Sequence, residues 1–174
     1  MNDDDDSWID EAVSRFEGPL TRYASRLLND HDRARDVVQE AFLKLCGSRR
    51  KRVEPILAEW LFTVCRNAAL DVLKKEKRMS TLNHVQISTQ SSVDPPPGER
   101  IEREETAASI LEALESLPES RREAIRFKFQ NGFSYEEIAR ITGKSVSHVG
   151  VLIHEGLKTL RAELNPTESH HKNS

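Results

Sequence analysis

The sequence predicts an all-α protein with two small helical domains, a flexible Pro/Ser-rich linker between them, and a helix-turn-helix in the C-terminal domain. Apolar residues recur at intervals of three or four through most of the 174 residues, which is the period of a helix. The stretch "MSTLNHVQISTQSSVDPPPGE" has no sustained period and ends in three prolines and a glycine, which is typical of a linker. Charged residues make up 32% of the chain and aromatic residues 6%, which favours a helix-rich protein over a β-sandwich.

The break in periodicity sets the expected domain boundaries. We expect a first domain over residues 1–80 and a linker over 81–99. A second domain should cover residues 100–165, followed by a short tail over 166–174.

The first helix is expected within the run "DDSWIDEAVSRFEGPLTRYASRLLND". Its apolar positions are spaced by three or four and comprise Ile9, Val13, Phe16, Leu20, Tyr23, Ala24 and Leu27. Gly18 and Pro19 lie in the middle of the run. Because proline lacks a backbone N–H, we expect a kink or a brief interruption there.

Two more helices are expected in the first domain. One runs from about Asp32 to Leu45, with its inner side formed by Val37, Val38, Ala41, Phe42 and Leu45. The other runs from about Pro55 to Lys77, because proline suits the first turn of a helix. Its expected buried stripe comprises Leu57, Leu61, Val64, Ala68 and Val72, with Trp60 beside it.

The second domain begins with an acidic amphipathic helix from about Arg100 to Ser116. Pro118 should open the next helix, which should stop at Asn131-Gly132, a suitable pair for a C-cap. The apolar residues of this helix are Ala124, Ile125, Phe127 and Phe129.

The last two helices have clear start and stop signals. Ser134 and Glu137 have the spacing of a capping box, in which each side chain bonds the backbone N–H of the other residue. Gly143 permits a left-handed turn, and Ser145 can cap a final helix that runs to about Leu164. Two short helices joined by a tight turn with a glycine indicate a helix-turn-helix over residues 134–160.

Charge distribution is more informative than the net charge of −3. Basic residues cluster at 49–52 ("RRKR") and 74–78 ("KKEKR"), and a phosphate backbone responds to such local patches. The start "MNDDDDSW" is acidic, unlike a secretory signal, and no apolar run approaches the roughly 20 residues that span a bilayer. We therefore expect a cytoplasmic protein without a membrane partner.

The sequence gives little support for an enzyme or a metalloprotein. Cys46 and Cys65, the two cysteines, lie in helical runs without metal-ligand spacing, and we interpret them as reduced core or half-buried thiols. There is no glycine-rich phosphate loop, nucleophile elbow or metal-spaced cluster, and no cofactor is expected.

A second functional pattern lies in "EWLFTVCRNAALDVLKKEKR", residues 59–78. Polar and basic residues recur at helical spacing opposite the apolar stripe, namely Arg66, Asn67, Asp71, Lys74 and Lys75. Asparagine can hydrogen-bond a base edge, and the cations can pair with phosphates. Trp60 is either a core residue or an aromatic platform for unstacked bases.

Three segments together resemble a known family. "DRARDVVQEAFLKLC", the stretch at 59–78, and "LPESRREAIRFKFQNGFSYEEIARITGKSVSHVGVLIHEGLKTLRAEL" resemble bacterial RNA polymerase sigma factors of the extracytoplasmic-function (ECF) type. The resemblance covers about residues 8–80 and 100–164. It implies a subunit that binds core RNA polymerase, directs it to a promoter and helps to melt the DNA.

The resemblance also implies a role for each segment. The segment "DVVQEAFLKL" would dock on the clamp helices of the polymerase largest subunit through Asp36, Gln39, Glu40, Phe42 and Lys44. The loop "GSRRKRVEP" would receive a flipped-out base. The segment around "RNAALD" would recognise and open the minus-ten element, with candidate residues Trp60, Arg66, Asn67, Asp71, Lys74, Lys75 and Arg78.

The last helix resembles the reader of the minus-thirty-five element. Its candidate contact residues are Lys144, Ser145, Ser147, His148, Val151, His154 and Glu155. Arginines that are typical of the family are missing at Gly150, Leu152 and Glu155, which leaves the specificity open. Leu152, like Val151, is a candidate for contacts with thymine methyl groups or with a protein.

The sequence also indicates the partners of this protein and leaves one alternative function open. Core polymerase and promoter DNA are the expected partners, and an anti-sigma factor is a further candidate. The alternative is a stand-alone helix-turn-helix regulator that binds palindromic duplex sites. The basic patch at 65–75 discriminates between the two, because a repressor would not require it.

Overall fold

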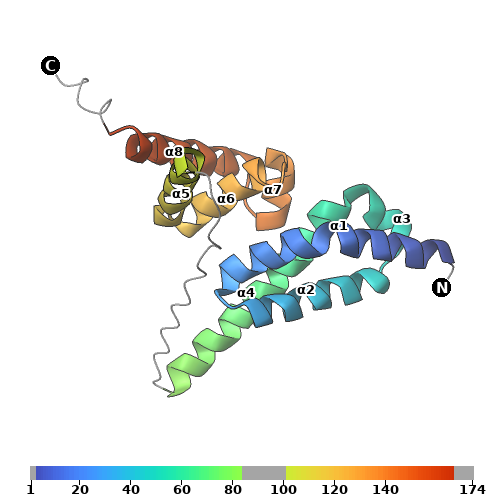
Figure 1. Cartoon of the computed structure of the whole chain (residues 1–174). Helices are drawn as coiled ribbons and strands as arrows, with labels where there is room; N and C mark the ends of the chain where they lie inside the picture. The colour runs from blue at the N-terminus through green and yellow to red at the C-terminus, as the bar shows by residue number, and fades with distance from the viewer. Residues whose placement is uncertain (1–2, 84–100, 167–174) are drawn as a thin grey trace. The chain divides into compact units, whose positions relative to one another are not determined.

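The computed structural model describes residues 3–83 and 101–166, and every secondary-structure element in them is helical (Figure 1). The chain divides into two compact units, residues 1–94 and 95–174. These findings confirm the predicted all-α class with two helical domains. Nearly all of the predicted linker, and most of the predicted tail with its histidines, lie outside the described residues.

Three long helices build the first unit. The elements in chain order are α1 (Asp3–Leu28), α2 (His31–Cys46), α3 (Arg50–Val53), the 3-10 turn η1 (Glu54–Ile56) and α4 (Leu57–Asn83). Helices α1, α2 and α4 pack against one another, and the C-terminal part of α4 extends past the other two (Figure 1). Helix α4 ends three residues beyond the predicted boundary at 80.

Helix α1 is continuous, so of the two predicted alternatives at Gly18-Pro19, a kink or an interruption, the interruption is wrong. The carbonyl that loses its helical donor to Pro19 belongs to Arg15, an exposed residue, so water can replace the missing bond. The buried residues recur every fourth position, and they are Trp8, Ala12, Phe16, Leu20, Ala24 and Leu28. Ile9 and Val13, which we expected inside, lie beside this line and are half-buried.

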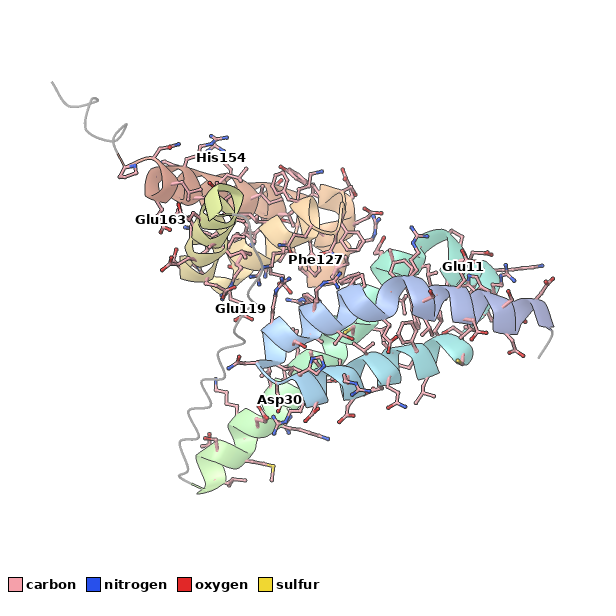
Figure 2. All side chains as sticks on the ribbon, in the orientation of Figure 1. Glu11, Asp30, Glu119, Phe127, His154 and Glu163 are labelled. Carbon is pink, nitrogen blue, oxygen red and sulfur yellow. The ribbon has the colours of Figure 1, made fainter. Side chains whose placement is uncertain are left out.

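The turn between α1 and α2 is fixed by two residues. Asn29 adopts a left-handed conformation with φ 52°, which asparagine tolerates better than most residues. Asp30 then caps α2, and its Oδ1 accepts hydrogen bonds from the backbone N–H groups of Asp32 (3.0 Å) and Arg33 (3.2 Å) (Figure 2). This turn reverses the chain so that the apolar stripes of both helices meet.

The segment that we expected to be a loop, "GSRRKRVEP", contains α3 and most of η1. Pro55 lies in the first turn of η1, and α4 begins only at Leu57. Helix α4 buries Leu61, Phe62, Cys65, Ala68 and Ala69, whereas the predicted stripe residues Leu57, Val64 and Val72 are half-buried. The difference arises because α4 contacts both α1 and α2, so its buried surface is wider than one stripe.

The two cysteines have different environments. Cys65 is fully buried in the first unit, and burial raises the pKa of its thiol to about 12, so it is a core residue as predicted. Cys46 is exposed at the end of α2, which corrects the expectation of a core or half-buried thiol.

The second unit contains α5 (Ile101–Ser116), α6 (Glu119–Phe129), α7 (Tyr135–Thr142) and α8 (Val146–Leu164). Its predicted elements are confirmed, except that α6 ends at Phe129 and Gly132, with φ 73°, belongs to the following turn. Of the four apolar residues that we noted on this helix, Phe129 is 61% exposed and the other three are buried. One apolar cluster joins α5, α6 and α8, and it comprises Ala113, Leu114, Leu117, Ile125 and Leu160.

An ion-pair clamp holds α5 against α6. Glu115 accepts hydrogen bonds from Nη1 of Arg122 (2.6 Å) and Nη2 of Arg126 (2.5 Å). Partial desolvation opposes ionisation, but these two guanidinium groups prevail and hold the pKa of Glu115 below its ordinary value. Both arginines are therefore committed to a structural contact.

The helix-turn-helix has the predicted caps. The backbone N–H of Glu137 donates to Oγ of Ser134 (3.1 Å), and the N–H of Ser134 donates to Oε2 of Glu137 (2.7 Å). Gly143 adopts the left-handed conformation with φ 70°, and Ser145 caps α8 by accepting from the N–H of His148 (3.1 Å). The capping box and the glycine turn are confirmed.

The two glycines of α8 differ in their surroundings. A Cβ at Gly156 would lie 2.5 Å from Cδ1 of Ile125, so glycine permits the close approach of α8 and α6. A Cβ at Gly150 would lie 3.7 Å from the ring of Tyr135, which is an ordinary contact. A side chain at position 156 would therefore displace the end of the Ile125 side chain, whereas one at position 150 would fit without a clash.

We predict opposite effects for alanine at these glycines. Gly150→Ala should stabilise the second unit by up to about 1 kcal/mol, because alanine favours the helix. Gly156→Ala should be less stable than Gly150→Ala by about 1–3 kcal/mol, because the buried Ile125 must move. Thermal unfolding of the full chain measures both, and equal stability of the two variants would contradict the packing role of Gly156.

Candidate nucleic-acid and partner interfaces

The predicted partner-binding face of α2 is exposed except for one residue. Asp36, Gln39, Glu40 and Lys44 are exposed, and Nζ of Lys44 lies 2.8 Å from Oε1 of Glu40. Phe42 is half-buried instead. It lines a shallow groove between α1 and α2 whose other residues are Val13, Glu17, Thr21, Asp32, Arg35, Asp36, Val38 and Gln39. Asp36, Gln39 and Phe42 thus meet at one groove.

Leu43 is a residue of this face that sequence reasoning missed. It is 67% exposed. It lies about one helical turn after Gln39 and Glu40 and next to Lys44, so it shares their side of α2. The signal was present in the sequence, because Leu43 is out of register with the buried residues Val38, Ala41 and Leu45. An exposed leucine within a polar surface is a suitable anchor for a protein partner.

The predicted DNA-binding residues of α4 lie mostly on its outer side. Asn67, Asp71, Lys74, Lys75 and Arg78 are exposed, whereas Trp60 and Arg66 are half-buried. The buried residues Cys65, Ala68 and Ala69 fix the rotation of the helix, and this rotation brings the polar set to the surface.

An ion pair between Arg33 of α2 and Glu76 of α4 makes the exposed charge of this region more positive. Glu76 is the acid within the "KKEKR" cluster, and Arg33 neutralises it. The exposed cations Lys74, Lys75 and Arg78 therefore determine the local potential. Lys77, also exposed, belongs to the same basic cluster, although it was not among the residues that we expected to contact the minus-ten element.

The predicted reading helix, α8, presents one narrow exposed face. Ser147, His148, Val151 and His154 are exposed, and Lys144, by the turn, and Glu155 are partly exposed. Figure 2 marks His154 on this helix. Leu152 is 8% exposed and belongs to the core, so the expectation that it contacts thymine or a partner is wrong. Its side chain is withdrawn by packing and cannot reach a base edge.

Lys158 is a further candidate on α8. It is exposed, and it lies one turn after His154 and two turns after Val151. Arg122 and Arg126 are held by Glu115, so they do not supply this face with charge. Lys158 and Arg161 are cations that the structure places along the exposed face of α8, and Lys144 lies beside it at the turn.

Two other findings concern membrane spans and metal sites among the described residues. None of the described helices is long and apolar enough to cross a membrane. Among the described histidines, cysteines, aspartates and glutamates, no group of three or more is placed to hold a metal ion.

Comparison with known families gives two matches that follow the two units. Residues 12–79 match the family described as Sigma-70 region 2, and residues 107–160 match Sigma-70, region 4. The first match contains α2 and most of α4, and the second contains the helix-turn-helix.

Individual relatives agree with these matches. The chain is 30% identical over 157 residues to the ECF RNA polymerase sigma factor SigE of Mycolicibacterium smegmatis. This alignment covers 89% of this chain but only 60% of that relative. It is 32% identical over 148 residues to the ECF RNA polymerase sigma factor EcfG of Rhodopseudomonas palustris, covering 83% of this chain and 78% of the relative.

A solved structure has a similar fold. The sigma factor RpoE from Bartonella quintana, crystallised in complex with the anti-sigma factor NepR, aligns with a TM-score of 0.67 at 24% identity. The alignment covers 91% of this chain and 97% of that chain.

The chain therefore belongs to the ECF-type RNA polymerase sigma factors, with sigma-70 regions 2 and 4. Proteins of this family direct RNA polymerase to promoters and are not themselves enzymes. The resemblance found in the sequence is confirmed.

We predict that Leu43 contributes to binding of core polymerase. Leu43→Ser should weaken the complex by about five- to thirtyfold, because a buried apolar anchor is worth about 1–2 kcal/mol. Titration of core polymerase with labelled protein measures the affinity. Ile56→Ser is the matched control, since Ile56 is also apolar and exposed (46%) in the same unit. Equal affinities of both variants and the unsubstituted protein would exclude Leu43 from the interface.

Proposed function

We propose that three surfaces of this sigma factor divide the work of promoter recognition. The exposed face of α2 docks on the clamp helices of the polymerase largest subunit. The outer face of α4 recognises and opens the minus-ten element, and the exposed face of α8 reads the minus-thirty-five element. The chain makes no covalent chemistry, and the polymerase transfers the nucleotides.

The outer face of α4 is the observation that carries this proposal. An asparagine that can bond a base edge and cations that can pair with phosphates lie on one helix, which its buried residues hold at a fixed rotation. A stand-alone regulator that binds duplex sites would have no use for this surface. The α2 face supports the proposal because it combines Leu43 with charged and polar residues, as protein interfaces do.

The α8 surface fits a reader that acts as part of a larger complex. It offers serine, histidine, valine and lysine side chains in place of the arginines that usually grip guanine. When the other unit is bound to polymerase, the local concentration of α8 near the promoter is high, so a few weak contacts suffice.

Location and regulation follow from the partner. A subunit of this kind works where core polymerase and the chromosome are, which places it in the cytoplasm. An anti-sigma factor is a further partner that we propose. Co-purification of the full chain with a protein that blocks polymerase binding would identify it.

Reconstitution with core polymerase tests the function directly. We expect the purified protein to bind core polymerase and to start transcription at defined sites on promoter-bearing genomic fragments. The start sites give the promoter sequences. A protein that bound palindromic duplex DNA without polymerase, and neither bound core nor started transcription, would support the stand-alone regulator instead.

We predict that the α4 face acts in promoter opening. Asn67→Ala combined with Lys74→Ala should reduce permanganate reactivity of thymines at the start region and leave core binding intact, because both side chains lie outside the core. The matched control is Ser14→Ala with Arg15→Ala, two exposed residues of α1. Reactivity equal to that of the control would count against the role of α4.

We predict that Glu155 affects upstream specificity. Glutamate can accept from a cytosine amino group, whereas arginine pairs with guanine. Glu155→Arg should therefore change the preferred bases when holoenzyme transcribes a library randomised at the minus-thirty-five element. Glu163→Arg, near the end of α8, makes the same charge change and should leave the preference unaltered. An unchanged preference in Glu155→Arg would remove α8 residue 155 from the reading surface.

A further inference from the structure

Arg50, in the short helix α3, is held by contacts from three sides. Its Nη1 donates to the backbone carbonyl of Asp4 (3.1 Å), and its Nη2 donates to Oε1 of Glu54 (3.1 Å). The guanidinium carbon lies 5.4 Å from the centre of the Trp8 ring, and Nη1 lies 3.9 Å from Oδ1 of Asp5. Arg50 thus connects α3 to the first turns of α1.

The other three cations of the "RRKR" cluster differ from Arg50. Arg49, Lys51 and Arg52 are exposed, and within the described part of the chain no ion pair involves them. Four adjacent cations are therefore divided into one that is neutralised by contacts within the fold and three that face solvent. The apolar contact of this segment is Val53, which is 5% exposed.

Local geometry explains why such a fastening is needed. Helix α3 has four residues, and its N-cap, Arg49, makes no side-chain capping bond. A helix of one turn is not stable by itself, so its position depends on contacts with other elements. Arg50 supplies contacts that bridge 46 positions of sequence, from α3 to the N-terminal turn of α1.

We propose that Arg50 is a positioning residue that fastens the segment Arg49–Glu54 to the acidic N-terminal turn of α1. In this position Arg49, Lys51 and Arg52 are presented together to the opened promoter strand. The proposal rests on the proposed role of this chain in promoter opening. It assigns the acidic residues near the N-terminus a supporting role in DNA binding, although their charge repels phosphate.

A double substitution tests this role of Arg50, because the proposal and simple electrostatics predict opposite changes in DNA affinity. Asp5→Asn combined with Glu54→Gln removes two negative charges and both carboxylate contacts of Arg50. Simple electrostatics predicts tighter DNA binding, whereas the loss of fastening predicts weaker binding. We expect about two- to tenfold weaker binding, since each exposed ion pair contributes little by itself. The probe is holoenzyme with a fork-junction DNA that carries a single-stranded minus-ten element from a promoter found by reconstitution.

The matched control makes the same change in charge away from Arg50. Asp6→Asn combined with Asp10→Asn removes two acids of α1 that make no ion pair with Arg50. This variant should bind the fork-junction DNA as tightly as the unsubstituted protein, or more tightly. Affinity for core polymerase should be unchanged in every variant, which checks that the first unit is folded.

A mutant cycle that combines Arg50→Gln with the two carboxylate substitutions completes the test. Arg50→Gln should weaken DNA binding by a similar factor, and combining it with Asp5→Asn and Glu54→Gln should give little further loss, because all three changes break one fastening. If the carboxylate variant binds as tightly as its control while Arg50→Gln binds weakly, Arg50 contacts DNA itself and the proposal is overturned. If Arg50→Gln fails to bind core polymerase, the carboxylate variant alone decides the outcome.

The outcome is separable from that of the proposed function. If the holoenzyme starts transcription but the DNA affinity of its variants depends only on their net charge, Arg50 has no positioning role. The sigma-factor activity is then unaffected. Absence of transcription with the unsubstituted protein would instead remove the proposed function.

Discussion

The packing of α4 against α1 and α2 is the interaction on which the first unit depends. Cys65, Ala68 and Ala69 are small, so α4 can lie close to both neighbours. This contact fixes the rotation of α4 about its axis, and the rotation decides that Asn67 and Lys74 face outward. The exposed polar face of α4, which we propose contacts DNA, follows from the burial of the opposite side, because a helix of a small bundle cannot bury its whole circumference.

The second unit solves a different problem, which is to hold a reading helix that contains two glycines. Gly156 allows α8 to approach Ile125 closely, and this contact offsets the low helix propensity of glycine. Arg122 and Arg126 of α6 are both held by Glu115 of α5, which fastens these two helices together. In the function that we propose, attachment to polymerase raises the local concentration of α8 near the promoter, so weak contacts are sufficient.

Sequence reasoning succeeded where the signal is local and failed where several elements compete for one residue. The Ser134–Glu137 capping box involves residues three apart, and it is present as predicted. Pro19 was expected to kink or interrupt α1, and the helix is not interrupted, because burial of the apolar line on either side outweighs one missing hydrogen bond. Leu43 is exposed and Leu152 is buried, and helical periodicity alone did not separate these two leucines. The functional roles of the site residues remain predictions, and the experiments above test them.

The sequence by itself determined the helical class, the caps of the helix-turn-helix, the two-domain organisation and the family. These properties depend on residues that are close in the chain, or on motifs whose order is preserved. The tertiary structure alone decided that α3 exists, that Arg33 neutralises Glu76, and that Arg50 turns toward α1 while its neighbours face solvent. These contacts join residues about 40 or more positions apart, and their formation depends on how three helices pack. Sequence spacing carries no information on such packing.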